Sequence, residues 1–354
     1  MSACSPSGRS DVIELMRSVI DLDYGGLAVP THAVLLTPRF PASRHLIFLL
    51  ADETGSLRFV AKVPRLASQN DGLEREMKNL ALLADSLLAE EARIPTVVGM
   101  SESGQRRVLV LTVVAGEPLD PFVVRRNPGA AVALVVDWLD QMPSARGDDS
   151  SRFERLLVGP LTRFAERAAA DAEKAMVDST LDILEPLRDA RLETVFEHGD
   201  LSHPNLLVMS DHRLGVVDWE LSEQSGYPVN DLGLFLASAS FALERAWTPD
   251  RQRAAYQRAF EDGGWAIRAA EGYVARRDIA LEHLSRLLLA CWARYVANTF
   301  ERLVDQDNLT AAHFGMAQGS VEILAQVRRT PHYVLWATAL EAITRGSVGP
   351  HDGR

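Results

Sequence analysis

The spacing of hydrophobic residues changes at residues 116–118, and this change limits the fold more than any other feature. Before it, short apolar runs bounded by turn residues predict strands at 33–37, 46–51, 57–63, 96–100 and 107–114. After it, apolar residues recur mostly at helical spacing, most clearly over 284–303. A small strand-rich part followed by a larger helical part predicts an α+β fold with two lobes.

Two amphipathic helices are expected in the strand-rich part, at 11–21 and 73–88. The second carries apolar residues at helical intervals, namely Leu73, Met77, Leu80, Ala84 and Leu87. In the larger part the spacing predicts extended chain only at two short segments, and helices over most of the rest. The two segments are 206–209 and 214–217, and the helical stretches are 128–142, 151–190 and 229–345.

The same pattern sets the expected domain boundaries. An N-terminal lobe is predicted at 11–114 and a C-terminal lobe at 115–345. The ends of the chain, 1–10 and 346–354, are rich in Ser, Pro and Gly and are predicted to be flexible tails.

Composition narrows the class of protein. The 354 residues include 37 Lys and Arg against 48 Asp and Glu, a net charge of −11, which argues against a nucleic-acid binder with a basic stripe. Cys4 and Cys291 are the two cysteines and suit a reducing compartment. The N-terminus lacks the apolar run of a signal peptide, and no stretch approaches the roughly 20 apolar residues that span a bilayer. We expect a cytoplasmic protein with no membrane contact, monomeric or weakly dimeric.

One segment, 195–220, carries most of the chemical information. His198-Gly-Asp200 is followed by Asn205 and then by Asp218-Trp-Glu220. Phosphoryl transfer explains these residue types, because one Asp can accept the proton of an incoming hydroxyl while an amide oxygen and a second carboxylate hold Mg²⁺. The spacing from Asp200 to Asn205 equals that of the protein-kinase catalytic loop.

Lys62 closes a predicted strand, where a lysine can reach the α- and β-phosphates of a nucleotide. The following helix offers Glu74 and Glu76 as partners. At 100° per residue, Glu76 falls at the edge of the apolar stripe and Glu74 points away from it. The geometry therefore favours Glu76 over Glu74.

Together these motifs resemble the aminoglycoside phosphotransferase/choline kinase-like family over roughly residues 30–345. The segments that carry the resemblance are AKVP, LEREMKNLALL, VLVLTVVAGEPL and HGDLSHPNLLV…GVVDWE. The resemblance implies a bilobal protein-kinase-like fold, with a small antiparallel-sheet lobe and a larger helical lobe. It further implies transfer of the γ-phosphate of ATP or GTP, with Mg²⁺, to a hydroxyl of a small molecule: an aminoglycoside or other antibiotic, a sugar or an amino alcohol. Antibiotic resistance is one role that such an enzyme would serve.

The resemblance also implies site residues. Asp200 would be the catalytic base and His198 would brace its loop; Asn205 and Asp218 would bind Mg²⁺, with Glu220 in support. Lys62, positioned by Glu76, would hold the phosphates. The hinge that binds adenine through backbone groups would include Leu111, Thr112 and Val113, and Asp231 would tie the following helix to the catalytic loop.

Two departures from the family pattern stand out. The loop at 37–45 contains no glycine, so Ser43, Arg44 or backbone amides would have to contact the phosphates. The catalytic loop reads D-L-S-H-P-N, which places His203 one position later than in many relatives. We therefore expect His203 to be an ordinary loop residue.

Alternatives remain open at this point. A catalytically degraded kinase-like scaffold would keep the fold but only bind a nucleotide or partner. A metallohydrolase would need further ligands near His198 and Asp200, and a protein kinase would need an activation segment after Glu220.

The acceptor is the least determined part. Six acidic positions in the helical part could receive ammonium groups, although each is an ordinary helix charge by default: Asp137, Asp140, Glu154, Glu244, Glu301 and Asp305. Tyr295 is predicted to pack in the core, and Trp292 is left open between core and acceptor stacking.

Overall fold

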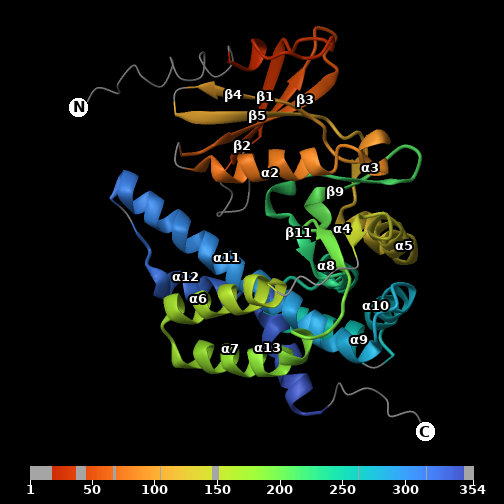
Figure 1. The fold of residues 1–354 in the computed structure, drawn as a ribbon, viewed down its shortest axis with the longest axis vertical. Helices are drawn as coiled ribbons and strands as arrows, with labels where there is room; N and C mark the ends of the chain where they lie inside the picture. The colour runs from red at the N-terminus through yellow and green to blue at the C-terminus, as the bar shows by residue number, and fades with distance from the viewer. Residues whose placement is uncertain are drawn as a thin grey trace. The chain divides into compact units, whose positions relative to one another are not determined.

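A computed structural model describes residues 18–36, 45–66, 69–103, 105–145, 151–261, 263–315 and 317–346. The chain forms two compact units (Figure 1). One runs to Glu117 and takes in Leu207–Ser222; the other comprises Pro118–Leu206 and the chain from Glu223 onward. The predicted lobes divide the sequence at a single boundary, so they do not include the return of Leu207–Ser222 to the first unit.

The first unit is built on an antiparallel sheet with the strand order β1-β2-β3-β5-β4. Its strands are β1 (His32–Leu36), β2 (His45–Ala51), β3 (Leu57–Pro64), β4 (Val97–Ser103) and β5 (Arg106–Thr112). Phe59, Ala61 and Val63 of β3 join the hydrophobic core of this unit. Because side chains alternate along a strand, Lys62 points to the other face.

Helix α2 (Asp71–Leu82) runs beside this sheet, and α3 (Leu87–Glu90) follows it (Figure 1). The predicted single helix at 73–88 is therefore wrong beyond Leu82. The chain restarts a helix because the Ser86 hydroxyl accepts a hydrogen bond from the backbone N–H of Ala89, which is an N-cap contact. The apolar spacing hid the break, since Leu83 and Leu88 on either side of it are both buried.

The five predicted strands of this unit are confirmed to within a few residues. The helix predicted at 11–21 is described only from residue 18, where it is helical. The predicted N-terminal tail, the 37–44 loop and the turn at Gly104 lie outside the described residues, as does the predicted C-terminal tail from 347 onward.

The segment that returns to the first unit carries a short hairpin, as predicted. It consists of β9 (Leu206–Val208) and β10 (Leu214–Val216), followed by a 3₁₀ turn at Trp219–Leu221. Arg93 fastens the hairpin: its carbonyl accepts from the N–H of Val216 at 2.8 Å, and its Nε donates to the carbonyl of Leu214 at 3.0 Å.

The second unit is mainly helical, and the long helix α11 (Leu284–Phe314) packs against α6, α7, α8, α12 and α13. Trp292, Val296 and Phe300 of α11 are fully buried. The other helices of this unit are α4 (Pro121–Arg126), α5 (Pro128–Leu139), α6 (Gly159–Ala168), α7 (Asp171–Leu184), α8 (Asn230–Glu244), α9 (Pro249–Phe260), α10 (Trp265–Arg276), α12 (Ser320–Val327) and α13 (Pro331–Thr344).

Extended chain in the larger part is not confined to 206–209 and 214–217, so that prediction is wrong. A small sheet with the order β11-β8-β7 joins β7 (Ser144–Ala145), β8 (Thr194–Glu197) and β11 (Glu223–Gly226), and β6 (Glu117–Pro118) pairs with β9. All four residues of β8 are buried, so the strand shows no alternation that the sequence could reveal. In the described ranges, none of the helices is both long and apolar enough to cross a membrane.

Candidate functional site

Lys62 is the centre of the charged group in the first unit. Its Nζ donates to both carboxylate oxygens of Glu76, at 2.7 and 2.6 Å, and to Oδ1 of Asp218 at 2.6 Å. The Lys62 and Glu76 side chains are almost completely buried, at 7% and 0% exposure, whereas Asp218 is 38% exposed. The structure therefore brings three predicted site residues together. Lys62 lies on β3, Glu76 on α2 and Asp218 on the segment that returns to the first unit.

The charges of this group do not balance. Burial alone would lower the pKa of Lys62, but Asp218, Glu76 and Glu220 outweigh it and raise that pKa, so the ammonium stays protonated. Burial raises the pKa of Glu76, and the contact with Lys62 opposes this. One ammonium thus faces three carboxyl groups. A surplus of carboxylate oxygen beside a lysine suits a divalent cation that carries a nucleotide.

Helix α2 fixes the backbone on which Asp218 sits. Oε1 of Glu76 accepts the N–H of Trp219 at 3.1 Å, and Nδ2 of Asn79, one turn later, donates to the carbonyls of Trp219 and Ser222 at 3.4 and 3.3 Å. Asp218 itself has φ +73° and ψ 68°, a left-handed conformation that is uncommon outside glycine. A strained residue held this firmly is typical of a functional position.

Glu220 lies beside the same group. Its Oε2 is 2.9 Å from Nδ1 of His45, the first residue of β2, and His45 is buried. A Cβ on Gly72 of α2 would come within 2.9 Å of the His45 ring, so a glycine leaves room for this contact. Ser43, predicted to touch the phosphates, lies outside the described residues.

The predicted adenine hinge ends β5. The N–H of Thr112 donates to the carbonyl of Thr96 at 2.9 Å, and that of Val113 donates to the carbonyl of Arg58 at 3.0 Å. Leu111 pairs with Val60 and Val97 in the sheet. These two amides are already used, so carbonyl groups here and the backbone from Val114 onward are what a base would meet.

The second unit holds the loop around Asp200. Gly199 has φ +82°, which lets the chain turn sharply between His198 and Asp200. The carboxylate of Asp231, at the start of α8, accepts the N–H of His198 at 2.6 Å and that of Gly199 at 2.9 Å, which confirms the predicted tie. Nδ1 of His198 accepts from the N–H of Asp200 at 3.3 Å. The loop is held by backbone contacts at each of its first three residues.

Burial and the nearby Glu197 raise the pKa of Asp231 to about 7, against the two N–H donors, which lower it. The group therefore titrates close to neutral pH. His203 sits in a 3₁₀ turn, and burial lowers its pKa while Asp120 partly opposes this.

The Asp200 carboxylate receives donors at both oxygens. Asn205 donates from Nδ2 to the Asp200 carbonyl at 2.9 Å and to Oδ2 at 3.2 Å, and the Tyr295 hydroxyl donates to Oδ1 at 3.4 Å. Because the amide nitrogen of Asn205 is used in this way, its side-chain oxygen is the atom that can meet a metal ion. Tyr295 was predicted to be core only, so the sequence missed this contact.

Trp292, left open by the sequence, is fully buried. Its Nε1 lies 3.3 Å from the hydroxyl of Tyr256, and its ring packs edge-on against Tyr256 and Phe260. It is therefore a core residue and does not stack on an acceptor.

The acidic side chains that could have received an ammonium group are mostly neutralised by arginines of the same unit. Of the six candidates, five form ion pairs: Asp140 with Arg276 and Arg277, Glu154 with Arg188, Glu244 with Arg258, and both Glu301 and Asp305 with Arg167. This pairing removes most of the negative charge that would favour a polycationic acceptor at these positions.

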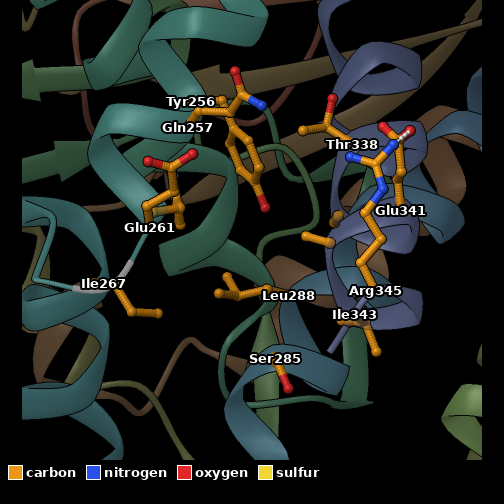
Figure 2. A pocket seen from close by; sticks show the side chains of 13 residues that line it. Tyr256, Gln257, Glu261, Ile267, Ser285, Leu288, Thr338, Glu341, Ile343 and Arg345 are labelled. Atoms are coloured by element: carbon orange, nitrogen blue, oxygen red, sulfur yellow. Dashed lines mark hydrogen bonds and ion pairs between the residues drawn. The ribbon is translucent and has the colours of Figure 1, made fainter. Parts of the chain in front are cut away.

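A cavity of about 430 Å³ opens between α9, α11 and α13 of the second unit (Figure 2). The hydroxyl of Tyr256 points into it, Leu288 lines its base, and an ion pair between Glu341 and Arg345 lies on one wall. Its size falls in the range of small-molecule pockets. None of the predicted site residues lines it, so this cavity is separate from the Asp200 contacts.

Within the described ranges, no three His, Cys, Asp or Glu side chains form a ready-made metal centre. Mg²⁺ commonly takes one or two protein carboxylates and completes its shell with phosphates and water. Asp218, with Glu220 nearby, offers the hard oxygen donors that Mg²⁺ prefers. A metallohydrolase built on His198 and His203 lacks its further ligands among these residues.

Comparisons with known proteins identify the family and the fold. A model of the phosphotransferase enzyme family matches residues 42–273. No curated protein sequence matches the chain. Among solved structures, an ethanolamine kinase of Plasmodium vivax is 11% identical with a TM-score of 0.58, over 98% of this chain and 97% of that one.

Two further structures extend the comparison. Choline kinase LicA of Streptococcus pneumoniae is 11% identical with a TM-score of 0.54, covering 96% and 99% of the two chains. A thermostable mutant of aminoglycoside phosphotransferase APH(4)-Ia, solved with AMP-PNP and hygromycin B, is 15% identical with a TM-score of 0.54, covering 92% and 97%. At these identities the likeness shows the fold, and the predicted kinase-like α+β fold is confirmed.

Proposed function

The chain belongs to the phosphotransferase enzyme family, and on this premise we propose that it is a small-molecule kinase. It would transfer the γ-phosphate of ATP, or of GTP, to a hydroxyl group. The observation that carries the proposal is Lys62, which is buried in the first unit and shared between Glu76 and Asp218. A lysine held by a helix glutamate and the carboxylate that follows the catalytic loop is the arrangement that kinases use to hold nucleotide phosphates.

In the proposed reaction Asp200 accepts the proton of the acceptor hydroxyl. The acceptor oxygen forms a bond to the γ-phosphorus, the bond from that phosphorus to the bridging oxygen of ADP breaks, and Asp200 later releases the proton to solvent. His198 braces the loop through its backbone contacts. Asn205 and Asp218 would hold Mg²⁺, with Glu220 in support; when bound, the ion neutralises charge on the phosphates.

In this proposal two parts of the first unit bind the nucleotide, one the phosphates and the other the base. Lys62 would contact the α- and β-phosphates, and Glu76 would keep it in place. The base would meet carbonyls around Leu111–Val113 and the backbone from Val114 onward. Ser43 remains the proposed phosphate contact of the glycine-free loop.

For the acceptor, the paired acids described above favour a neutral or singly charged molecule, such as a sugar, an amino alcohol or a weakly basic antibiotic, over a polycation. The first test is therefore a phosphorylation screen across sugars, amino alcohols, nucleoside antibiotics and aminoglycosides with MgATP. Turnover of polycations alone would contradict this order of preference. Tight MgATP binding without turnover of any acceptor would instead favour the degraded scaffold.

Asp200→Asn tests the catalytic assignment. We expect turnover to fall by about 10²–10⁴-fold, the usual contribution of a general base, with nucleotide affinity unchanged. The matched control is Asp211→Asn, which changes an exposed aspartate of the hairpin after the loop. An Asp200→Asn protein with the wild-type rate would show that another group accepts the proton.

A further inference from the structure

We propose that Tyr295 is a positioning residue for the Asp200 carboxylate. Helix α11 contacts the catalytic loop region at two points, through Arg294 and through Tyr295. The inference deepens the proposed function, because it rests on Asp200 as the base. The juxtaposition is direct: the Tyr295 hydroxyl donates to Oδ1 of Asp200 at 3.4 Å, while Asn205 donates to Oδ2 at 3.2 Å.

The first contact is made by Arg294, the neighbour of Tyr295 on α11. Its guanidinium donates to both oxygens of Glu197, at 3.0 and 2.6 Å, and Glu197 immediately precedes His198. Glu197 is fully buried and also accepts the N–H of Tyr227, and a Cβ on Gly226 would overlap its side chain at 2.1 Å. Arg294 and Tyr295, which are adjacent on α11, therefore hold the residue before the loop and the Asp200 carboxylate within it.

The second contact is made by Tyr295 itself, and it depends on how the tyrosine ring is packed. The Tyr295 ring lies on the ring of His332, with centroids 4.0 Å apart at 35°, and His332 in turn lies 6.4 Å from Trp292. Trp292 is fixed in the core of the unit. The Tyr295 ring is thus packed against a ring that itself contacts the core, which limits the movement of the hydroxyl away from the carboxylate.

The charged and titratable groups around Tyr295 are Asp200, Arg302 and His332. Burial, and after it the charge of Asp200, raises the pKa of Tyr295 far above neutral, so its hydroxyl keeps the proton that it donates. Burial lowers the pKa of His332 to about 4, so the imidazole under the ring is neutral near pH 7.

Two donors, one on each oxygen, fix the plane of the Asp200 carboxylate and so the direction in which it can accept a proton. A tyrosine that only packed in the core would not affect that direction. Removing the hydroxyl should therefore slow the reaction, while the stack on His332 remains.

The test is Tyr295→Phe in the full chain, read by steady-state hydrolysis of MgATP with water as acceptor. We expect kcat to fall about five- to tenfold, which corresponds to the loss of one hydrogen bond, with KM for ATP unchanged. In an Asp200→Ala background the same substitution should leave the residual rate unchanged, because the carboxylate that Tyr295 positions is already absent. A purely structural role would instead lower the rate in both backgrounds.

The matched control is Tyr333→Phe, which removes a hydroxyl that donates to Glu173 at 2.7 Å on other helices of the same unit. The hydrolysis rate should not change in this variant. An unchanged kcat in Tyr295→Phe, or an equal fall in Tyr333→Phe, would overturn the positioning role. Circular dichroism spectra report whether each variant is folded.

Failure of the proposed function gives a different result. If Asp200→Asn hydrolysed MgATP at the wild-type rate, the catalytic assignment would fall, and the positioning role would fall with it. If Asp200→Asn were inactive and Tyr295→Phe behaved as wild type, the proposed function would stand without Tyr295.

Discussion

The Lys62 group of the first unit and the Asp200 loop of the second both gather acidic side chains, but they stabilise them by different means. Around Lys62, three carboxyl groups share one ammonium, and one of them, Asp218, is more than a third exposed. Around the loop, Glu197 has its own arginine and Asp231 receives two backbone N–H groups. Asp200 is met by an amide and a hydroxyl.

This difference separates two physical tasks. The Lys62 group has more carboxyl groups than cations, so its electrostatic balance improves when a divalent cation arrives. The loop has few unmet groups, so it is formed before any ligand binds. We therefore expect changes in the loop to act mainly on folding stability and rate, and changes around Lys62 to act mainly on nucleotide affinity.

The largest effect should come from Arg294→Met. It leaves the fully buried Glu197 without its cation, and breaking one partner of a buried pair costs about 3–5 kcal/mol. We expect the free energy of unfolding to fall by that amount in urea denaturation. The control is Arg258→Met at the exposed pair with Glu244, where about 0–1 kcal/mol is expected. Equal losses in the two variants would mean that the Glu197 pair does not hold the loop.

Next in size is Lys62→Met, which should weaken MgATP binding about 10- to 100-fold, a change of roughly 1.4–2.8 kcal/mol. Isothermal titration calorimetry with MgATP measures it. Lys78→Met, an exposed lysine on the same α2 helix, is the control and should bind like wild type. If Lys62→Met kept its affinity but lost as much stability as Arg294→Met, the two groups would not differ in task.

Much of this arrangement could be predicted from sequence because short-range spacing encodes it. The strands of the first unit follow from alternation, and the choice of Glu76 over Glu74 follows from 100° per residue along α2. The family resemblance implied that Asp218 and Lys62 serve the same nucleotide, and the structure brings the two side chains into contact. Each of these relies on a local period or on a motif of fixed length.

The remaining features depend on tertiary contacts, which the spacing of residues in the sequence does not indicate. Tyr295 lies on the apolar stripe of α11, and whether its hydroxyl ends in the core or on Asp200 is decided by His332, which comes from another helix. The acids considered for the acceptor looked like solvated helix charges, yet arginines distant in sequence pair with them, as Arg167 does with Glu301. Sequence spacing cannot identify such partners.

The stability of the loop is also expected to depend on pH, through Asp231. The pKa of Asp231 is raised to about 7 in the folded chain against an ordinary value near 3.8, so the folded state holds a proton that the unfolded state has lost between these values. Stability from this group is full below about pH 3.8 and is lost as pH rises through 7, by up to about 1.4 kcal/mol per pH unit. Urea denaturation between pH 4.5 and 7.5 measures it.

Asp231→Asn removes this titration, so the difference in unfolding free energy between wild type and variant should decline across that range. The exposed Asp178 on α7 provides the control, since Asp178→Asn should give a difference that does not vary with pH. A flat difference for Asp231→Asn as well would show that the two N–H donors keep Asp231 ionised throughout, and the loop would then resemble the Lys62 group in depending on charge.

The smallest effect is expected at Glu74, and it sharpens the assignment of Glu76. Glu74 pairs with Arg107 at a position where both side chains are more than a third exposed, so Glu74→Gln should cost less than about 1 kcal/mol and leave MgATP affinity unchanged. Glu76→Gln removes one charge from a buried carboxylate that both holds Lys62 and accepts the N–H of Trp219, so it should weaken MgATP binding by several-fold. Because the two residues lie two positions apart on one helix, calorimetry on this pair separates the contact with Lys62 from any general loss of acidic charge on α2.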